Sequence, residues 1–580
     1  MPTAIVRRPL PSPGERPELP ADLPPLLARV YALRGVASAR ELDQALTALP
    51  APQRLKGIDR AVDLLSAALS TDARILIVAD YDADGATACA LAVRGLRALG
   101  ARHVDYLVPN RQRHGYGLTP AIVELAAARR PELLITVDNG IASLEGVAAA
   151  QARGWQVLVT DHHLPGERLP AADAIVNPNQ PGCGFPSKAL AGVGVMFYVL
   201  LALRARLRTS GWYGACGLTE PNLARLLDLV ALGTVADVVP LDHLNRVLVG
   251  QGLARIRSGA AVPGIRALAE VAGRDPARLG CSDIGFTLAP RLNAAGRLED
   301  MALGIECLLC DDPVRARELA VTLDRLNRER RDIEAVMQAA ALEDLERLGL
   351  DAAGLPFGLC LYDPHWHQGV VGILAARVRE RTHRPTIVFA PGDPGWLKGS
   401  ARSVPGLHLR DALAAVDARH PGLIERFGGH AAAAGLTLAE ANYPDFAAAF
   451  DAEVRRHLGA ADLRGVLYSD GELAPGDCTL AIAERLRDGG PWGQGFPEPL
   501  FDGEFEVVAA RTLKERHLKL SVRRPGLDEV LDAIAFGAAG SCPEPLPGTR
   551  LRLAYRLDVN EWNGRRRLQL LVLHLEPAGA

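Results

Sequence analysis

Three short apolar runs in the first third of the chain each end in acidic or histidine side chains. The runs cover residues 75–79, 133–137 and 157–160, and they lead into Asp80-Tyr81-Asp82-Ala83-Asp84-Gly85, Asp138-Asn139-Gly140 and Asp161-His162-His163. Carboxylates crowded at the end of a buried strand raise each other's pKa, and a divalent cation, which prefers oxygen ligands, relieves that repulsion. The pattern therefore indicates a metal-dependent enzyme.

The region from about residue 50 to residue 300 alternates these apolar runs with segments rich in alanine and leucine. Residues 86–99, 120–129 and 143–153 are the first predicted crossover helices. Strands that alternate with helices predict an α/β fold with a parallel, doubly wound sheet, in which ligands bind beyond the carboxyl ends of the strands. The acids and histidines that follow the strands would meet at that edge.

The remaining regions complete a prediction of five parts. Proline-rich residues 1–45 would form an extended arm with one short helix, 46–311 the catalytic α/β domain, 312–350 a long connecting helix, 351–462 a second α/β domain and 463–580 an all-β domain. Five short strands in the last part predict a small barrel of the oligonucleotide-binding type. These strands would cover residues 500–509, 518–523, 529–536, 550–559 and 567–575.

The composition excludes several classes of protein. The formal charge is −3 over 580 residues, so contact with a polyanion would have to come from local basic patches. The nine scattered cysteines show no disulfide spacing and indicate reduced thiols in the cytoplasm. We find neither a secretion signal nor an apolar run long enough to span a membrane, so we expect a cytoplasmic protein without a membrane segment.

Carboxylates dominate the candidate metal ligands. They are Asp80, Asp82, Asp84 and Asp138, joined by His162 and, as a further candidate, Asp237. Taken alone, Asp237 would more often be a helix cap or a turn residue than a ligand, but beside the other acids a ligand is favoured. Carboxylate sets with one histidine suit Mg²⁺ or Mn²⁺ better than Zn²⁺, and two such ions bridged by a carboxylate support in-line attack of water on phosphorus.

Glycine-rich and basic segments elsewhere predict phosphate contacts. Each has a structural alternative, such as a solvated basic loop or a structural histidine, and we interpret the segments at 110–117 and 291–297 as basic loops. So many arginines favour a polynucleotide with a terminal phosphate over a mononucleotide. The candidate contacts are Arg111 (or Arg113 in its place), Arg291, Asn293, Arg297, His367, Lys398, Ser400, Arg402, Gly428, Gly429, His430 and Trp562, which would stack on a base.

Four segments resemble the motifs of the DHH phosphoesterases: Asp80 to Gly85, Val137 to Gly140, Thr160 to His163 and Thr234-Val235-Ala236-Asp237. Gly428-Gly429-His430 resembles the signature of the DHHA1 domain in the same superfamily. With residues 291–297, the segment around His367 and the C-terminal barrel, the chain is similar to the RecJ family of bacterial 5′→3′ exonucleases specific for single-stranded DNA.

This resemblance implies two Mn²⁺ or Mg²⁺ ions and release of 5′-mononucleotides in DNA repair and recombination. By motif position Asp80, Asp82 and Asp138 would hold one ion, and Asp84, Asp138, His162 and Asp237 the other. The catalytic residues would be Asp138, Asp161 and His163, with His163 near the scissile phosphate. The family also implies single-strand-binding protein and a RecQ-type helicase as partners. We expect a monomer, because two lobes of one chain can close a cleft without a second subunit.

Two other functions fit parts of the pattern. The first is a DHH phosphodiesterase for cyclic dinucleotides or very short RNA, which would need neither the barrel nor the many arginines. The second is a non-catalytic replication scaffold, which the complete carboxylate set disfavours because clustered acids without a metal cost stability. The sequence therefore predicts a single-strand exonuclease over both alternatives.

Overall fold

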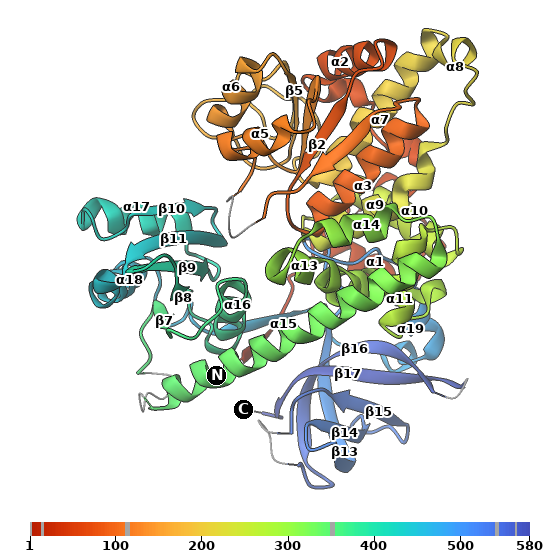
Figure 1. Ribbon diagram of the computed structural model, residues 1–580. Helices are drawn as coiled ribbons and strands as arrows, with labels where there is room; N and C mark the ends of the chain where they lie inside the picture. Colours follow the sequence, from red (N-terminus) through yellow and green to blue (C-terminus); the bar gives the residue numbers. More distant parts are fainter. Residues whose placement is uncertain are drawn as a thin grey trace. The chain divides into compact units, whose positions relative to one another are not determined.

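The computed structural model of the chain describes residues 3–12, 17–110, 116–347, 354–539, 544–562 and 565–579 (Figure 1). The chain forms two compact units. The larger unit comprises Leu10–Asn327 and Glu484–Pro499, and the smaller unit comprises Met1–Pro9, Arg328–Ala483 and Leu500–Ala580. The domain boundaries predicted from the sequence follow chain order and stay a prediction.

The larger unit is built around a parallel five-stranded sheet of order β3-β2-β4-β5-β6. α5 and α6 cover one face, and α3 and α7 cover the other (Figure 1). β2 and β4 are buried along their whole length, which explains their unbroken apolar sequence. The predicted parallel sheet is thus confirmed. The bounds are β2 Ile75–Ala79, α3 Ala83–Ala98, β3 Val104–Leu107, α5 Pro120–Ala127, β4 Leu133–Val137, α6 Leu144–Ala152, β5 Gln156–Thr160, β6 Ala174–Val176 and α7 Gly192–Thr209.

Helices follow the sheet along the chain. The prediction of a basic loop at residues 291–297 is wrong, because these residues lie in α13. Leu292 and Ala295 are buried at helical spacing, and five of the seven residues are arginine, leucine or alanine, which favour helices. The long helix predicted at 312–350 is present as α15 (Pro313–Arg347), and the division between the units falls within it. The other bounds are α9 Leu227–Ala236, α10 His243–Arg257, α11 Pro263–Val271, α12 Cys281–Asp283, a π-helix Ile284–Leu288, α13 Ala289–Leu298 and α14 Ala302–Leu309.

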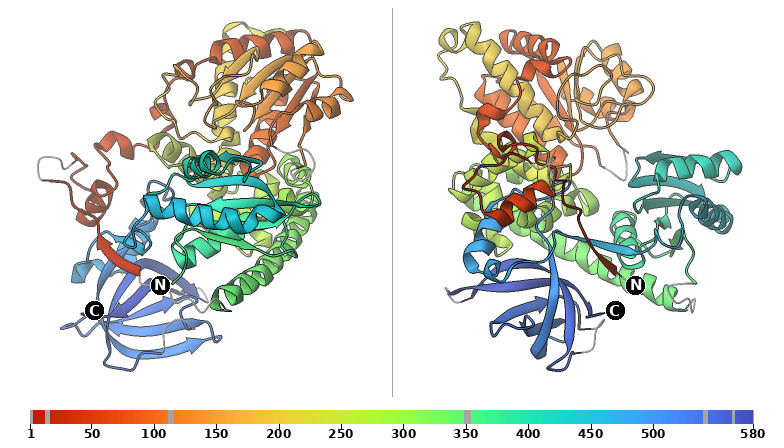
Figure 2. Two further views of the ribbon diagram at one scale, coloured as in Figure 1. Left: turned by 90° about the vertical axis from the view of Figure 1, so that its left-hand side faces the viewer. Right: turned by 180° about the vertical axis from the view of Figure 1, so that it is seen from behind.

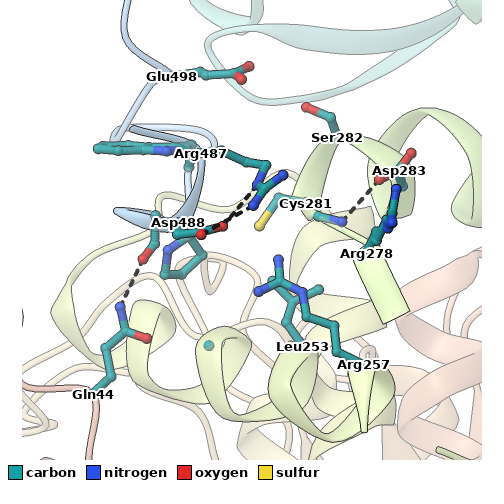
Figure 3. Close-up of a pocket in the computed structure, with 15 residues that line it drawn as sticks. Gln44, Leu253, Arg257, Arg278, Cys281, Ser282, Asp283, Arg487, Asp488 and Glu498 are labelled. Atoms are coloured by element: carbon teal, nitrogen blue, oxygen red, sulfur yellow. Dashed lines mark hydrogen bonds and ion pairs between the residues drawn. The ribbon is translucent and has the colours of Figure 1, made fainter. Parts of the chain in front are cut away.

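Segment Glu484–Pro499 returns to the larger unit and packs on the N-terminal helix α1 (Pro25–Ala32). Tyr31 stacks on Trp492 and Phe496, with ring centroids 6.1 and 6.3 Å apart. The same segment, which includes the end of α19 (Leu480–Asp488), closes a pocket of about 240 Å³ against α10 and α12 (Figure 3). A stretch from the C-terminal third of the chain is therefore part of the larger unit.

The smaller unit contains a mixed five-stranded sheet and a closed barrel (Figures 1 and 2). The sheet has the order β10-β11-β9-β8-β7, and only β7 and β8 run parallel. Residues 398–402 lie in strand β9, so the alternative of a solvated basic loop does not apply to them. The bounds are β7 Leu359–Tyr362, α16 Val371–Thr382, β8 Thr386–Pro391, β9 Trp396–Arg402, α17 Leu409–Arg419, β10 Arg426–Gly429, β11 Ala433–Ala439 and α18 Tyr443–His457.

The barrel confirms the predicted all-β domain. Its strands close in the order β13-β14-β15-β17-β16, and Phe501 and Phe505 lie in its core against Tyr555. The N-terminal strand β1 (Thr3–Arg7) pairs in parallel with β12 (Gly465–Ser469), and Arg7 forms an ion pair with the buried Asp502 of β13. The bounds are β13 Phe501–Leu513, β14 His517–Arg523, β15 Val530–Ala535, β16 Arg550–Trp562 and β17 Arg565–Pro577. Among the helices described, none combines the length and the apolar character needed to cross a membrane.

Candidate metal centre

The polar segments after β2, β4 and β5 meet at one edge of the sheet. Ala79 pairs with Val137, and Val137 with Thr160, so the residues that follow, Asp80, Asp138 and Asp161, leave the sheet side by side. The chain runs from β2 to β3 on one side of β2 and then returns to β4 on its other side. The strand order therefore reverses at β2, which makes this edge a topological switch point. Open α/β sheets bind their ligands at such points.

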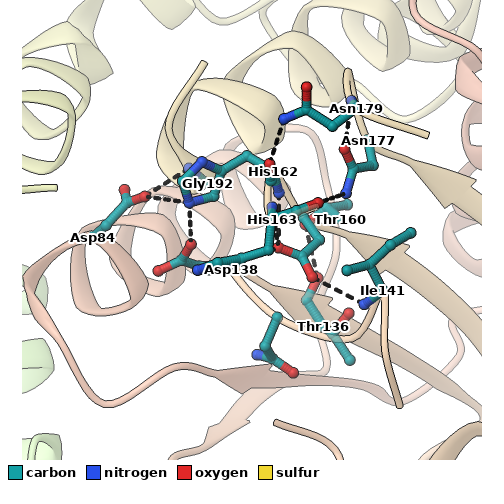
Figure 4. Close-up of polar contacts among 12 residues, drawn as sticks. Asp84, Thr136, Asp138, Ile141, Thr160, His162, His163, Asn177, Asn179 and Gly192 are labelled. Carbon is teal, nitrogen blue, oxygen red and sulfur yellow. Dashed lines mark hydrogen bonds and ion pairs between the residues drawn. The ribbon is translucent and has the colours of Figure 1, made fainter. Parts of the chain in front are cut away.

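Two helix N-termini surround the first acidic segment. Asp82 caps α3 by accepting a hydrogen bond from the Gly85 N–H at 2.9 Å. Asp84 is buried, and its carboxylate accepts hydrogen bonds from the N–H groups of Gly192 (2.6 Å) and Val193 (3.0 Å) at the start of α7 (Figure 4). Helix N-termini stabilise negative charge, so both acids are held where a cation can bind them.

Asp138 lies at the centre of the site in a strained conformation. Its φ is 64°, in the left-handed region that few residues other than glycine adopt. A Cβ on Gly192 would lie 2.6 Å from the Asp138 side chain, so only glycine fits there. The buried Asp138 Oδ1 lies 3.1 Å from His162 Nε2, but it accepts no hydrogen bond of regular geometry within the part of the chain described. A buried oxygen in this state is a candidate metal ligand.

The structure brings all six candidate ligands together. Asp80, Asp82 and Asp138 form one group whose ligand atoms lie within 4.8 Å of one another, and Asp84, His162 and Asp237 form another. His162 Nε2 lies 3.4 Å from Asp237 Oδ2 and 3.9 Å from Asp84 Oδ2. The 3.1 Å approach of His162 to Asp138 joins the two groups. We name these six residues the acidic cluster.

The buried carboxylates of the acidic cluster repel one another, so a bound cation would stabilise their charged forms. Burial, with the neighbouring charge of Asp82, raises the pKa of Asp84 to about 7. Burial and the other carboxylates hold the pKa values of Asp138 and Asp237 well above their ordinary range. Five carboxylates and one imidazole, with an unsatisfied buried oxygen among them, fit Mg²⁺ or Mn²⁺ and do not fit a thiolate-preferring metal.

Asp161 supports the histidines and lies outside the acidic cluster. Its carboxylate accepts hydrogen bonds from the main-chain N–H groups of Ile141 (2.9 Å), His162 (2.7 Å) and His163 (3.0 Å), and its Oδ1 lies 2.8 Å from His163 Nδ1 (Figure 4). Burial opposes a charged imidazole, but the hydrogen bond and charge of Asp161 outweigh it and raise the pKa of His163 to about 9. The carboxylate therefore fixes both the main chain and the ring of His163.

Sequence reasoning missed several supporting residues. Asn177 and Asn179 donate hydrogen bonds to the main-chain oxygens of His163 (2.9 Å) and His162 (2.6 Å). Asn177 directly follows β6 and Asn179 lies two residues later, so their place after the last strand of the sheet was the available signal. Tyr116, whose hydroxyl oxygen lies 3.1 Å from His163 Nδ1, was also missed.

Two predicted nucleic-acid contacts of α13 have structural partners. Asn293 Oδ1 accepts a hydrogen bond from the Ala83 N–H at 2.8 Å, so this side chain holds the first acidic segment. Arg291 forms an ion pair with Asp324 at 2.8 Å, and its side chain is 12% exposed. Arg297 lies on the same helix. Contact of these three residues with nucleic acid stays a prediction.

The predicted phosphate residues of the smaller unit lie around β9. The first turn of α16 packs against this strand so closely that a Cβ on Gly372 would lie 2.9 Å from Ser400 Oγ and 3.0 Å from Arg402 Nη2. Gly428, Gly435 and Ser400 face one another across β10, β11 and β9. Arg402 and Ser400 therefore lie beside a helix N-terminus, which is a favourable place for phosphate.

The other predicted contacts surround this arrangement or fall outside it. His367 Nδ1 accepts a hydrogen bond from the Gly369 N–H at 3.1 Å before α16, and Lys398 lies in β9. Gly429 has a φ of 145°, and His430 follows it in the turn to β11. Arg111 and the Trp562 side chain lie outside the described residues, although the Trp562 main chain pairs with Arg565 at the end of β16.

Comparison with known proteins agrees with this fold. The DHH family N-terminal domain matches residues 74–234, the DHHA1 domain residues 356–456 and the RecJ OB domain residues 469–574. The fold and the acidic cluster thus define a DHH protein with a DHHA1 domain and an oligonucleotide-binding barrel.

Whole-chain relatives narrow this class. The single-stranded-DNA-specific exonuclease RecJ of Dickeya dadantii is 57% identical over 565 residues, which cover 97% of this chain and 98% of the relative. RecJ of Escherichia coli is 53% identical over 97% of this chain and 98% of its own length. The crystal structure of Thermus thermophilus RecJ with Mn²⁺ matches with a TM-score of 0.82 at 33% identity, over 100% of this chain and 80% of that one. The chain belongs to the RecJ family.

Proposed function

We propose that this protein is a metal-dependent exonuclease that degrades single-stranded DNA from the 5′ end to 5′-mononucleotides in DNA repair and recombination. The observation that carries the proposal is the acidic cluster, with Asp138 at its centre, in a chain of the RecJ family. The relatives from Dickeya dadantii and Escherichia coli are exonucleases specific for single-stranded DNA. A solved relative binds Mn²⁺ and another structure of it binds Mg²⁺.

The acidic cluster would hold two Mn²⁺ or Mg²⁺ ions. Asp80, Asp82 and Asp138 would bind one, and Asp84, Asp138, His162 and Asp237 the other, with Asp138 as the bridge. Two such ions, when bound, activate a water molecule and stabilise the attacking and leaving oxygens of an in-line displacement at phosphorus. The two groups of ligand atoms and their link through His162 and Asp138 support this division.

The remaining residues of the site orient the substrate. Asp161 accepts the Nδ1 hydrogen of His163, so Nε2 is left to face the scissile phosphate and donate to one of its oxygens when the ring is protonated. Asn177 and Asn179 hold the main chain of the two histidines in place. His163 would thus act on the phosphate, and Asp161 would act through His163 by holding its ring.

The 5′ end would bind in the smaller unit at Ser400, Arg402 and the N-terminus of α16, with His367, Lys398, Gly428, Gly429 and His430 around them. In the larger unit, Arg111, Arg291 and Arg297 are proposed separately as contacts to the nucleic acid. An arginine fork matches phosphate oxygens, and a terminal phosphate carries more charge than an internal one. The close packing of Gly372 on Ser400 and Arg402 supports this assignment. Trp562 would stack on a base farther along the strand.

The protein would act as a monomer in the cytoplasm, with single-strand-binding protein and a RecQ-type helicase as partners. The cysteines in the described residues are free thiols, which fits a reducing compartment. The RecJ family membership supports the partners.

Digestion of a long single strand labelled at either end tests the proposal. With Mn²⁺ present, we expect a 5′ label to appear at once as a mononucleotide and a 3′ label to stay on progressively shorter strands. Asp138→Ala is the matched control and should show neither. Release of the 3′ label first would contradict the polarity, faster cleavage of a dinucleotide would favour the phosphodiesterase, and a protein free of metal and activity would favour the scaffold.

A further inference from the structure

Tyr116 lies against His163 beside the acidic cluster. Its hydroxyl oxygen is 3.1 Å from His163 Nδ1 and 3.5 Å from Nε2, and the hydroxyl donates a hydrogen bond to the main-chain oxygen of Asp138 at 3.3 Å. The Nδ1 atom also lies 2.8 Å from Asp161. One side chain therefore connects the histidine ring to the main chain of the central ligand.

The tyrosine ring is itself held by other rings. Tyr116 and His163 meet edge to face, with centroids 5.7 Å apart and planes at 77°. Tyr81, which lies between Asp80 and Asp82 in the sequence, also meets Tyr116 edge to face, with centroids 6.2 Å apart and planes at 80°. Edge-to-face contacts of this kind are favourable. Tyr116 thus contacts both the first acidic segment and His163.

The contacts are suited to orienting an imidazole. Rotation about the last side-chain torsion of histidine meets only a broad, shallow preference, so a ring bonded at one nitrogen can still turn. Asp161 lies 2.8 Å from Nδ1, and the Tyr116 hydroxyl adds a second polar contact, 3.1 Å from Nδ1 and 3.5 Å from Nε2, that limits this rotation. Tyr116 is 45% exposed, so burial of apolar surface alone does not explain its place beside a buried cluster.

We propose that Tyr116 is a positioning residue for phosphodiester hydrolysis, because its hydroxyl, anchored on the Asp138 carbonyl, holds the His163 ring in the orientation that faces the scissile phosphate. This inference rests on the proposed nuclease function. The Tyr116 hydroxyl would orient His163, and the Tyr116 aromatic ring would supply the contacts with Tyr81 and His163.

Tyr116→Phe separates these parts, because it removes the hydroxyl and keeps the ring. We expect kcat on a single strand to fall about tenfold, equal to about 1.4 kcal/mol. We expect KM to stay within about twofold, because the ring and its surface stay in place. The matched control is Tyr213→Phe on α8 (Trp212–Ala215), whose hydroxyl also donates to a main-chain oxygen at 3.3 Å but lies outside the acidic cluster. This control should leave both constants unchanged.

A double-mutant cycle identifies the residue through which Tyr116 acts. In a His163→Ala background, measured under single-turnover conditions so that slow rates are accessible, Tyr116→Phe should cause no further loss. An equal loss in both backgrounds would assign the hydroxyl to the Asp138 main chain and overturn the inference. Wild-type kcat for Tyr116→Phe would also overturn it. An inactive wild-type protein would instead refute the proposed function.

Discussion

Asp161→Asn should show how strongly one buried carboxylate supports the site. Asp161 is fully buried and accepts four hydrogen bonds, from the main-chain N–H groups of Ile141, His162 and His163 and from the His163 ring. Asparagine has nearly the same shape but one acceptor oxygen and no charge. Its oxygen would stay on the side with three donors, so its amide N–H₂ would face the N–H of Ile141.

The cost follows from these contacts. A buried N–H left without an acceptor costs about 1–3 kcal/mol, and removing one partner of a buried ion pair costs about 3–5 kcal/mol. Because asparagine keeps the shape and three of the acceptor contacts, we expect the lower end of that range. The free energy of unfolding should fall by about 3 kcal/mol near pH 6.

The loss should depend on pH. Burial opposes ionisation of Asp161, but the His163 hydrogen bond and charge outweigh it and lower the pKa of Asp161, so its contribution is present above the unfolded pKa of about 3.9. His163 has a folded pKa of about 9 against an unfolded value of about 6.5, so its contribution is complete below about pH 6.5 and fades as pH rises toward 9. The difference between wild type and Asp161→Asn should therefore shrink between pH 6 and pH 9.

Urea unfolding of the metal-free protein at both pH values measures this difference. Asp173→Asn is the matched control, because Asp173 accepts a main-chain hydrogen bond from Val157 at 2.8 Å in the same sheet but contacts no histidine ring of the described residues. It should show no change of its effect between the two pH values. A loss below about 1 kcal/mol for Asp161→Asn, or a loss independent of pH, would refute the reasoning.

Three further predictions concern the metals and the nucleic acid. Metal binding at pH 7 should release protons and strengthen as pH rises, because burial raises the pKa of Asp84 to about 7. Equal calorimetric heats of binding in buffers of different ionisation enthalpy would contradict this. Arg402→Ala should slow cleavage of 5′-phosphorylated strands more than of 5′-hydroxyl strands, and equal losses would mean that Arg402 does not read the terminal phosphate. The double variant Arg565→Ala/Arg567→Ala should make single-strand binding less dependent on salt. The slope of log K against log salt concentration should fall by about 0.7 for each phosphate contact that is lost. An unchanged slope would mean that β17 of the barrel does not contact the strand.

The acidic cluster could be predicted from the sequence because its geometry is local. Parallel strands place their carboxyl ends at one edge, so acids that follow β2, β4 and β5 must meet there, and the register of Ala79, Val137 and Thr160 shows that they do. The role of Asp237 as a ligand was harder to predict, because Asp237 follows a helix whose position against the sheet depends on long-range packing. The five barrel strands were also predictable from their alternation and spacing.

Contacts between distant segments were not predictable. Nothing near Asn293 in the sequence indicates that its side chain accepts from Ala83, 210 positions away. The pairing of Arg291 with Asp324 depends on how α13 and α15 pack. The return of Glu484–Pro499 to the larger unit is likewise decided by packing, with Trp492 and Phe496 stacked on Tyr31. Such contacts leave no periodic pattern in a single sequence.

We propose above all that the acidic cluster binds two catalytic ions, with Asp138 as a ligand of both. Anomalous diffraction from crystals of this protein grown with Mn²⁺ tests it most directly. We expect two anomalous peaks, about 3.5–4 Å apart, with the Asp138 carboxylate between them. A single peak, or a pair of peaks that Asp138 does not bridge, would contradict it.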